Sequence, residues 1–268
     1  MLKRGDISEE VRLMQKALSA CTKASNNLTT YNGIFGPMTE ATLKLYQKEN
    51  NLEVTGVYDD ATKELLSPVI EYMFLKLSDF DEYAKDIKVK PSALKAVYTV
   101  ESRGDGFIKA LPVIFYEGHV FYRLYKAEFG LKKADELARS YPTIIYPVWT
   151  NKHYLGGLAE YKRYRAAIAV NEKIAQMSTS YGLFQVMGFN HKAAGYENLE
   201  DYVLAMQDSE YEQLNAGCNF IVSNSKMHKA LQELDWAGFA RTYNGAGYKA
   251  NSYDIRLSRA YSQFEGKK

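Results

Sequence analysis

The segment Pro91–Gly106, PSALKAVYTVESRGDG, predicts an amphipathic helix that carries a carboxylate at its end. Proline suits the first turn of a helix, where its missing N–H costs no hydrogen bond. Leu94, Val97 and Tyr98 share one face with Glu101, because residues at i, i+3, i+4 and i+7 project from the same side. We expect the helix to end at the serine, glycine and aspartate residues that close the segment.

The position of Glu101 in this segment favours an acid that stays protonated. A carboxyl group at the inner end of an apolar stripe is partly removed from water, which raises its pKa. A carboxylic acid that is still protonated near neutral pH is what a general acid needs. The alternative interpretation is a glutamate that simply leaves into solvent, because most amphipathic stripes only build a core.

Composition limits the classes of function. A chain of 268 residues with 46% apolar content can form one or two globular domains. The net charge of +2 gives no basic excess, so we expect no nucleic-acid partner. The first residues, MLKRGDISEE, lack a signal-peptide core, and no apolar run is long enough for membrane insertion. We therefore expect synthesis in a cytoplasm and exit by a route that the chain does not encode.

Metal and cofactor chemistry has no support in the sequence. Cys21 and Cys218 are far apart and match no metal or redox spacing, and Cys218 falls in an apolar row that predicts a buried thiol. The four histidines form no zinc-binding motif, and there is no glycine-rich phosphate loop. We predict no metal and no cofactor, which disfavours the zinc-dependent amidases and endopeptidases.

The N-terminal part contains a weak internal repeat. The phrases GIFGPMT from Gly33 and GVYDDAT from Gly56 each open a helix. Both have an aromatic residue two positions after the glycine and a threonine six positions after it. A doubled turn-and-helix unit explains this pattern, and coincidence among common turn residues is the alternative. Asp6 or Ser8 can cap the helix in front of the repeat.

This N-terminal part resembles the small three-helix peptidoglycan-binding domain. The similarity covers RGDISEEVRLMQKAL, YNGIFGPMTEATLKLYQKENNL and TGVYDDATKELL. In that family the ligand groove lies around the turn that holds the GIFGPMT phrase. The resemblance therefore implies that Tyr31, Asn32 and Phe35 contact peptidoglycan, although many members have aspartate at the position of Asn32.

The rest of the chain predicts a mainly helical unit with one strand. Ser67-Pro68 ends the first unit, and residues 67–78 are apolar at helical spacing, which predicts a short packed connection. Residues 113–116 are typical of a strand, and Glu117 follows them. Helices are expected over about 158–177, 199–232 and 252–264, with a further helix capped by Asp235 and six to eight helices in all. The irregular stretch SYPTIIYPVWTNKHYLGG is expected to form a groove wall.

Three short phrases in this unit occur in a characteristic order. They are Glu101-Ser102, the turn YGLFQ from Tyr181 to Gln185, and the turn TYNGAG that contains Tyr243 and Asn244. The order resembles the goose-type lysozyme and lytic transglycosylase superfamily. Over the whole unit, YGLFQVMGFNHKAAGY and DWAGFARTYNGAGYKANSYD are similar to the N-acetylmuramidase domain of phage endolysins. We expect a mainly α fold with a minor β element and three segments: a peptidoglycan-binding domain (1–68), a connection (69–78) and a catalytic domain (79–268).

The resemblance implies roles for the site residues. Glu101 would be the catalytic acid, and Tyr181, Gln185, Tyr243 and Asn244 would contact substrate. Glycoside hydrolysis also uses a second carboxylate, as a base or a nucleophile. Close in sequence to Glu101, Glu117 is the better candidate and Asp105 the next, although the superfamily often manages with one dominant glutamate.

The resemblance also implies a biological setting, that of a phage endolysin acting on bacterial peptidoglycan. Such a protein accumulates in the cytoplasm of the infected bacterium, passes the inner membrane through a holin and then reaches the periplasm and wall. We expect a monomer. The leading hypothesis is a muramidase, the alternatives being a lytic transglycosylase and a non-catalytic wall-binding or virion protein.

Overall fold

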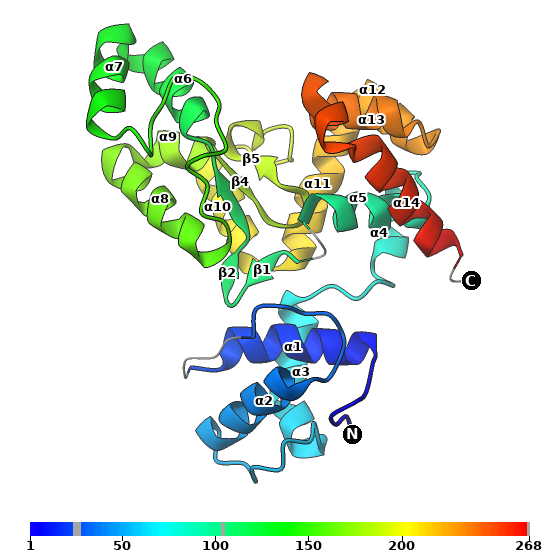
Figure 1. Ribbon diagram of the computed structural model, residues 1–268. Coiled ribbons are helices and arrows are strands. Elements are labelled where there is room, and N and C mark those ends of the chain that lie inside the picture. Colours follow the sequence, from blue (N-terminus) through cyan, green and yellow to red (C-terminus); the bar gives the residue numbers. More distant parts are fainter. Residues whose placement is uncertain (24–27, 103–104, 267–268) are drawn as a thin grey trace.

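The computed structural model describes residues 1–23, 28–102 and 105–266, and these are mainly helical with two small sheets (Figure 1). The expected mainly α fold with a minor β element is confirmed. The N-terminal unit holds three helices: α1 (Glu9–Cys21), α2 (Pro37–Glu49) and α3 (Asp60–Met73). The remaining helices are α4 (Phe80–Asp86), α5 (Pro91–Ser102), α6 (Gly118–Phe129), α7 (Leu131–Ser140), α8 (Gly157–Val170), α9 (Glu172–Met177), α10 (Leu199–Asp208), α11 (Glu210–Ser223), α12 (Ser225–Gln232), α13 (Trp236–Tyr243) and α14 (Tyr253–Glu265).

The doubled turn of the N-terminal unit is built by two buried glutamines. Gln15 of α1 accepts from Gly33 N and donates to Ile34 O and the Thr39 hydroxyl, at 2.9–3.0 Å. Gln47 of α2 makes the same three hydrogen bonds one repeat later, at 2.9–3.1 Å. Its partners are Gly56 N, Val57 O and the Thr62 hydroxyl. The repeat predicted from the sequence is therefore real, and each helix supplies the amide that closes the following turn.

Helix α3 is longer than the sequence suggested. It continues through Pro68 to Met73 instead of ending at Ser67-Pro68. Proline inside a helix removes one backbone hydrogen bond, but here the following turn has packing that offsets the loss. Leu66 and Ile70 are buried, and Phe74 just after the helix is 1% exposed. Packing has therefore overridden the local breaker. Of the two residues expected to cap α1, Asp6 and Ser8, it is Ser8 that does so: its hydroxyl accepts from Val11 N at 3.1 Å.

The larger unit has more and shorter helices than the expected six to eight. Its described residues contain eleven α-helices, α4 to α14. The stretch expected to form one helix over 158–177 is divided at Asn171, and the stretch over 199–232 is divided at Ser209 and Asn224. Each of these three residues caps the following helix with its side chain, so the capping preference was stronger than the apolar periodicity.

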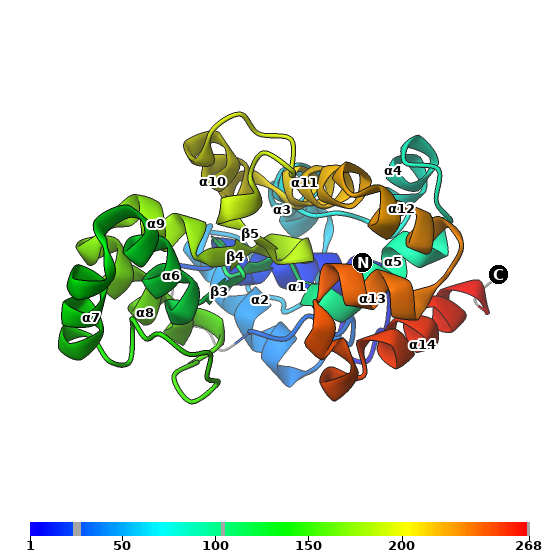
Figure 2. The same cartoon turned by 90° about the horizontal axis from the view of Figure 1, so that it is seen from above.

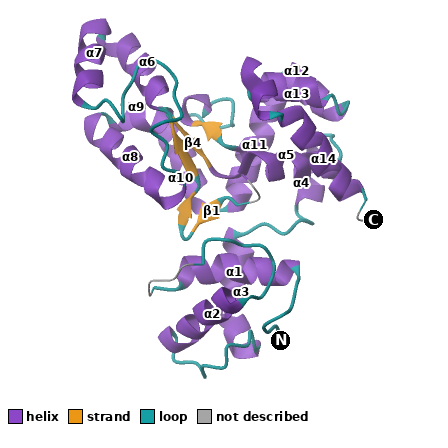
Figure 3. Cartoon of the chain, viewed as in Figure 1, coloured by secondary structure: helices purple, strands orange, loops and turns teal. Residues whose placement is uncertain are grey.

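A three-stranded antiparallel sheet, β3-β4-β5, joins the distant segments of this unit (Figure 3). Strand β3 (Ile114–Tyr116) pairs with β4 (Thr179–Tyr181), which pairs with β5 (Val186–Met187). Ile114 lies opposite Tyr181 and Tyr116 opposite Thr179. This register places Val113, which precedes β3, beside the turn 182–185 that joins β4 to β5, where Gly182 N donates to Val113 O at 2.8 Å. Glu117, which follows β3, lies at the other end of β4, where its N–H donates to Ser178 O at 2.8 Å.

The two units pack against each other through a β-hairpin. Strands β1 (Phe107–Ile108) and β2 (Leu111–Pro112) point from the larger unit toward α1 (Figure 1). Phe107 is 2% exposed and belongs to the core of the N-terminal unit, edge-on to Phe74 at 6.1 Å. Lys109 N donates to the Tyr31 hydroxyl at 3.3 Å. The connection is therefore part of a packed interface, as the absence of a Gly/Ser-rich tether predicts.

The two glutamines of the repeat give a stability prediction. Gln47→Leu keeps the side-chain volume but leaves one N–H, one carbonyl and one hydroxyl without their buried partner. We expect the free energy of unfolding to fall by about 2–4 kcal/mol, measured by urea denaturation. Lys48→Leu on the next, exposed position of α2 is the control and should change stability by less than about 0.5 kcal/mol. Equal effects of the two substitutions would contradict the role of Gln47.

Candidate active site

A cleft of about 530 Å³ lies where α5, the three-stranded sheet and α14 meet. Viewed from above, helices α6–α9 form one lobe and helices α11–α14 with α5 form the other, and the sheet lies between them (Figure 2). Three of the expected site residues line this cleft: Glu101, Glu117 and Gln185. The other lining residues are Val100, Val113, Ile114, Phe115, Gly156, Gly157, Ser180, Tyr253 and Arg256.

Glu101 sits in the last turn of α5, beyond the buried residues Leu94, Val97 and Tyr98. Burial raises the pKa of its carboxyl group to about 7, even though two neighbours favour the charged form. Asn244 Nδ2 donates to Oε1 at 3.1 Å and to Oε2 at 3.4 Å. Desolvation exceeds this contribution, so the carboxyl group keeps its proton to a higher pH than an exposed glutamate does.

Arg256 is the second neighbour that acts on Glu101. It lies on α14, which packs along α5, and its Nη2 donates to Val100 O at 3.0 Å. Its guanidinium also stacks on Tyr253, 5.1 Å from the ring centroid. The positive charge lowers the pKa of the Glu101 carboxyl group. Sequence analysis missed Arg256, since a single arginine on a C-terminal amphipathic helix carries no special signal.

Glu117 lines the same cleft from the end of β3, where it precedes α6. Its Oε2 accepts from the Tyr154 hydroxyl at 2.6 Å and lies 3.2 Å from His119 Nδ1. Tyr154 packs against Phe115, with ring centroids 4.3 Å apart. The structure therefore brings both candidate carboxylates to one cavity, with Glu117 held by partners from the irregular stretch and α6.

The irregular stretch forms part of the cleft wall, as expected from the sequence. Gly156 and Gly157 line the cleft. The buried carboxylate of Glu160 accepts from Leu155 N at 2.9 Å and from Gly156 N at 3.2 Å, and Arg163 pairs with it. One buried ion pair in α8 thus fixes the end of a segment that has no regular structure of its own.

Gln185 has a left-handed backbone, φ +48°, in the turn between β4 and β5. Its Nε2 donates to Val113 O at 3.2 Å and to Gly182 O at 2.8 Å, and its Oε1 accepts from Ser180 Oγ at 2.9 Å. A non-glycine residue in this region is strained and must be held by its surroundings. Gln185 therefore lines the cleft while its amide is used mainly to close the turn.

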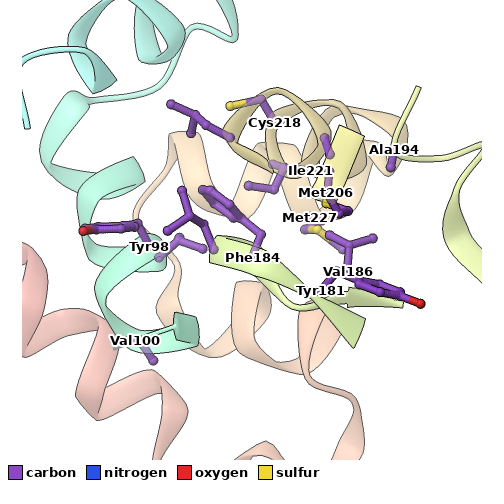
Figure 4. Packing of buried hydrophobic residues seen from close by; sticks show 14 of the residues in the cluster. Tyr98, Val100, Tyr181, Phe184, Val186, Ala194, Met206, Cys218, Ile221 and Met227 are labelled. Carbon is purple, nitrogen blue, oxygen red and sulfur yellow. The ribbon is translucent and has the colours of Figure 1, made fainter. Parts of the chain in front are cut away.

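Tyr181 and Tyr243 are not among the described residues that line the cleft. Tyr181 is 2% exposed, and its hydroxyl bonds to that of Tyr164 at 3.0 Å. The Tyr243 hydroxyl donates to Phe184 O. Figure 4 shows Tyr181 and Phe184 within the core beside the sheet. These tyrosines support the turn that carries Gln185, and a direct contact with substrate stays a prediction. Asn244, from the same phrase as Tyr243, reaches Glu101 instead.

Gln213 of α11 holds two site segments together and was missed by sequence analysis. Its Oε1 accepts from Leu183 N at 3.0 Å, and its Nε2 donates to Gly106 O at 3.3 Å. A Cβ atom on Gly106 or Gly182 would lie 2.2 Å and 2.5 Å from the Gln213 amide. Gly182 also has φ +67°, so both positions require glycine. The sequence signal that could have revealed Gln213 is a polar residue on the otherwise apolar face of α11.

Asp105, the second alternative for a base, is not among the described lining residues. Its Oδ1 lies 3.7 Å from Lys16 Nζ at the contact between the two units. Burial raises the pKa of this carboxyl group to about 6.

A smaller cavity, about 220 Å³, lies in the N-terminal unit around the first repeated turn. Asn32 lines it, together with Gln15, Leu28, Thr29, Thr30, Ile34, Gly36, Pro37, Met38 and Thr39. Tyr31 and Phe35 are buried, with 7% and 1% exposure. Of the three expected wall-contacting residues, the structure thus brings Asn32 alone to this cavity among the described residues.

Among residues 1–23, 28–102 and 105–266, no three or more His, Cys, Asp or Glu side chains gather in a way that could hold a metal ion. None of the helices in these ranges combines the length and the apolar character needed to cross a membrane.

Comparisons with known proteins agree with this architecture. The family described as N-acetylmuramidase matches residues 90–265, more than half of the chain. The family described as putative peptidoglycan binding domain matches residues 8–66. A crystal structure of the Burkholderia AP3 phage endolysin is similar at 34% identity and a TM-score of 0.65, over 98% of each chain. The search of curated proteins gave no match.

The raised pKa of Glu101 predicts a change in stability with a defined sign. Between pH 4.5 and about 7 the folded protein keeps a proton that the unfolded chain has lost, so stability falls as pH rises through this window. Glu101→Gln removes this cost. We expect the variant to be more stable than the wild type by up to about 3 kcal/mol at pH 8 and about equal at pH 4, measured by urea unfolding. A stabilisation that is the same at both pH values would contradict the assignment.

Substitution of Arg256 tests the pKa of the Glu101 carboxyl group through the pH dependence of activity. Loss of its positive charge disfavours the ionised form of Glu101, so the pKa of that carboxyl group rises. In the wild type we expect the alkaline limb of the activity profile near pH 7, and in Arg256→Met this limb should move to higher pH. Arg259→Met makes the same charge change on α14, at a residue that does not line the cleft, and should leave the limb in place. A downward shift in Arg256→Met would overturn the interpretation.

Proposed function

Because the chain belongs to the N-acetylmuramidase family, whose members are glycoside hydrolases, we propose that it is a phage endolysin that cleaves the glycan strands of bacterial peptidoglycan. The bond in question is the β-1,4 bond between N-acetylmuramic acid and N-acetylglucosamine. The similar crystal structure is that of a phage endolysin, which supports the biological setting. The single observation that carries the proposal is Glu101, a carboxylic acid whose pKa is raised to about 7 in the wall of a cleft of about 530 Å³.

In this proposal Glu101 donates its proton to the glycosidic oxygen as the bond from the sugar C1 to that oxygen breaks. Positive charge then develops on the muramic acid ring as an oxocarbenium-like state. The ionised Glu101 left behind stabilises this charge, and Asn244 keeps the carboxylate oriented through its two donated contacts. Water adds to C1, and its proton leaves to a base.

Glu117 is our candidate for that base. It lines the same cleft as Glu101 and is oriented by Tyr154 and His119. An inverting enzyme needs the two carboxyl groups about 6.5–9.5 Å apart, with room for a water between them. Asp105 is a weaker candidate because Lys16 faces it at the contact between the units.

The proposal divides the chain into a peptidoglycan-binding domain over 1–68, a connection over 69–78 and a catalytic domain over 79–268. The matched family supports wall binding by the first domain, with Asn32 at the cavity as the candidate contact. We further propose a monomer that needs no cofactor, accumulates in the host cytoplasm and reaches the periplasm and wall after holin action.

A lytic transglycosylase is the second candidate function. It would use the same acid, but the C6 hydroxyl of muramic acid would attack C1 in place of water and leave a 1,6-anhydro end. The sequence phrases shared with that superfamily keep this candidate open. A second carboxylate in the cleft, Glu117, favours inverting hydrolysis, in which a base other than the acid takes the proton of the attacking water. In the transglycosylase reaction the ionised Glu101 would take the proton of the C6 hydroxyl.

Mass spectrometry of the products from purified peptidoglycan tests the proposal. We expect reducing muramic acid ends from the wild type, a rate at least about 10³-fold lower for Glu101→Gln, and an intermediate loss for Glu117→Gln. The control is Asp208→Gln, which changes an acidic residue at the C-terminal end of α10 and should keep full activity. Products with anhydro ends, lighter by one water, would show that the enzyme is a transglycosylase and not a hydrolase. Full activity of Glu101→Gln would remove its role.

A further inference from the structure

A buried ion pair links the two units. Lys16 of α1 places its Nζ 2.6 Å from Glu210 Oε1 of α11, and the two side chains are 1% and 0% exposed. Burial, together with the nearby charge of Arg12, lowers the pKa of the Lys16 ammonium group, and the Glu210 carboxylate opposes this effect. Such a pair is costly to desolvate unless its remaining hydrogen-bonding positions are filled.

Those positions are filled by two backbone N–H groups from different segments. Glu210 Oε1 also accepts from Gly106 N at 3.0 Å, and Oε2 accepts from Leu75 N at 3.0 Å. One carboxylate therefore holds the connection that leaves α3, the start of the β1–β2 hairpin and the lysine of the N-terminal unit. None of these contacts lies in the cleft itself.

The path from Gly106 to the cleft runs through described backbone contacts. Gly106 O accepts from Val113 N at 2.8 Å, and Val113 O accepts from Gly182 N at 2.8 Å. The same Val113 carbonyl accepts from Gln185 Nε2 at 3.2 Å. Gln213, one turn after Glu210, ties Gly106 O to Leu183 N. Val113 and Gln185 line the cleft, so the floor of the cleft rests on the backbone that Glu210 holds.

We propose that Lys16 is a positioning residue for the cleft, acting through Glu210 on the backbone beneath it. The N-terminal unit is then a structural part of the catalytic machinery as well as a wall anchor. This inference rests on the proposed function, since it assumes that glycan is cleaved in this cleft.

The reason for the effect is electrostatic. Without Lys16, the Glu210 carboxylate is buried without its compensating charge, which is strongly unfavourable. The group relieves this by moving toward water, and the movement weakens its acceptance from Gly106 N and Leu75 N. The floor of the cleft then loosens, and small errors in the placement of catalytic groups cost one to two orders of magnitude in rate.

The test measures kcat and KM on soluble, uncrosslinked glycan strands, per folded molecule as judged by near-UV circular dichroism. Lys16→Met should lower kcat about 10-fold or more, with binding to intact, heat-treated wall unchanged. The matched control is Lys63→Met, which removes an exposed lysine of the same unit that pairs with Glu10 at 3.0 Å. Its kcat should stay within about twofold of the wild type.

A double-mutant cycle keeps the inference testable if one variant folds poorly. Glu210→Gln removes the other charge, and Lys16→Met/Glu210→Gln removes both charges of the pair while an amide oxygen remains as acceptor. Groups that act as a pair are non-additive, so the double variant should have a kcat no lower than that of either single variant. Losses that multiply would show that the two residues act independently and would overturn the proposal.

The outcomes separate this inference from the proposed function. A lower melting temperature with full kcat per folded molecule in Lys16→Met would make Lys16 purely structural and end the inference, while cleavage by the wild type would still support the function. Intact strands after incubation with the wild type would instead end the proposed function. Faster hydrogen exchange at Val113 and at residues 182–185 in Lys16→Met, with the lower kcat, is the pattern that the proposal requires.

Discussion

The larger unit depends on a set of hydrogen bonds at the start of α11. They are made by the side chains of Glu210 and Gln213. Gly106 and Leu183 lie far apart in sequence, and neither belongs to a long strand that could fix it. Gln213 bonds to both, and Glu210 adds a second bond to Gly106. The short sheet is too small to be stable alone, so its geometry is imposed by this polar pair together with the buried aromatic residues around it.

A second constraint is the balance of effects at Glu101. Desolvation raises the pKa of its carboxyl group, whereas Asn244 and Arg256 lower it. The resulting pKa of about 7 allows the group both to give up and to take back a proton near neutral pH. General acid catalysis is most effective when the pKa lies near the working pH. Asn244 directly follows α13 and Arg256 lies on α14, so the C-terminal segments contribute to the chemistry by tuning an acid that α5 carries.

The sequence predicts the acid and its helix well, because apolar spacing and a proline at the first turn are local signals. Glu117 was placed correctly after a strand for the same reason. The role of Gln185 was only partly predictable, since its amide bonds to Val113 O, which is 72 residues away. Local periodicity contains no information about such a partner. The extra helix breaks at Asn171, Ser209 and Asn224 show the opposite case, where a local capping signal was present but was outweighed in the interpretation by the apolar pattern.

The buried lysine at the contact between the units also explains why the interface takes one arrangement. An apolar pair would pack at least as well as Lys16 and Glu210, because buried ion pairs often bring little net stability. An apolar side chain, however, could not accept from two backbone N–H groups, so Glu210 is needed where Gly106 and Leu75 meet. A carboxylate in that place needs a cation, and the cation comes from the other unit. Any shift of α1 along the interface would separate the charges, and the specificity of the contact follows from that cost.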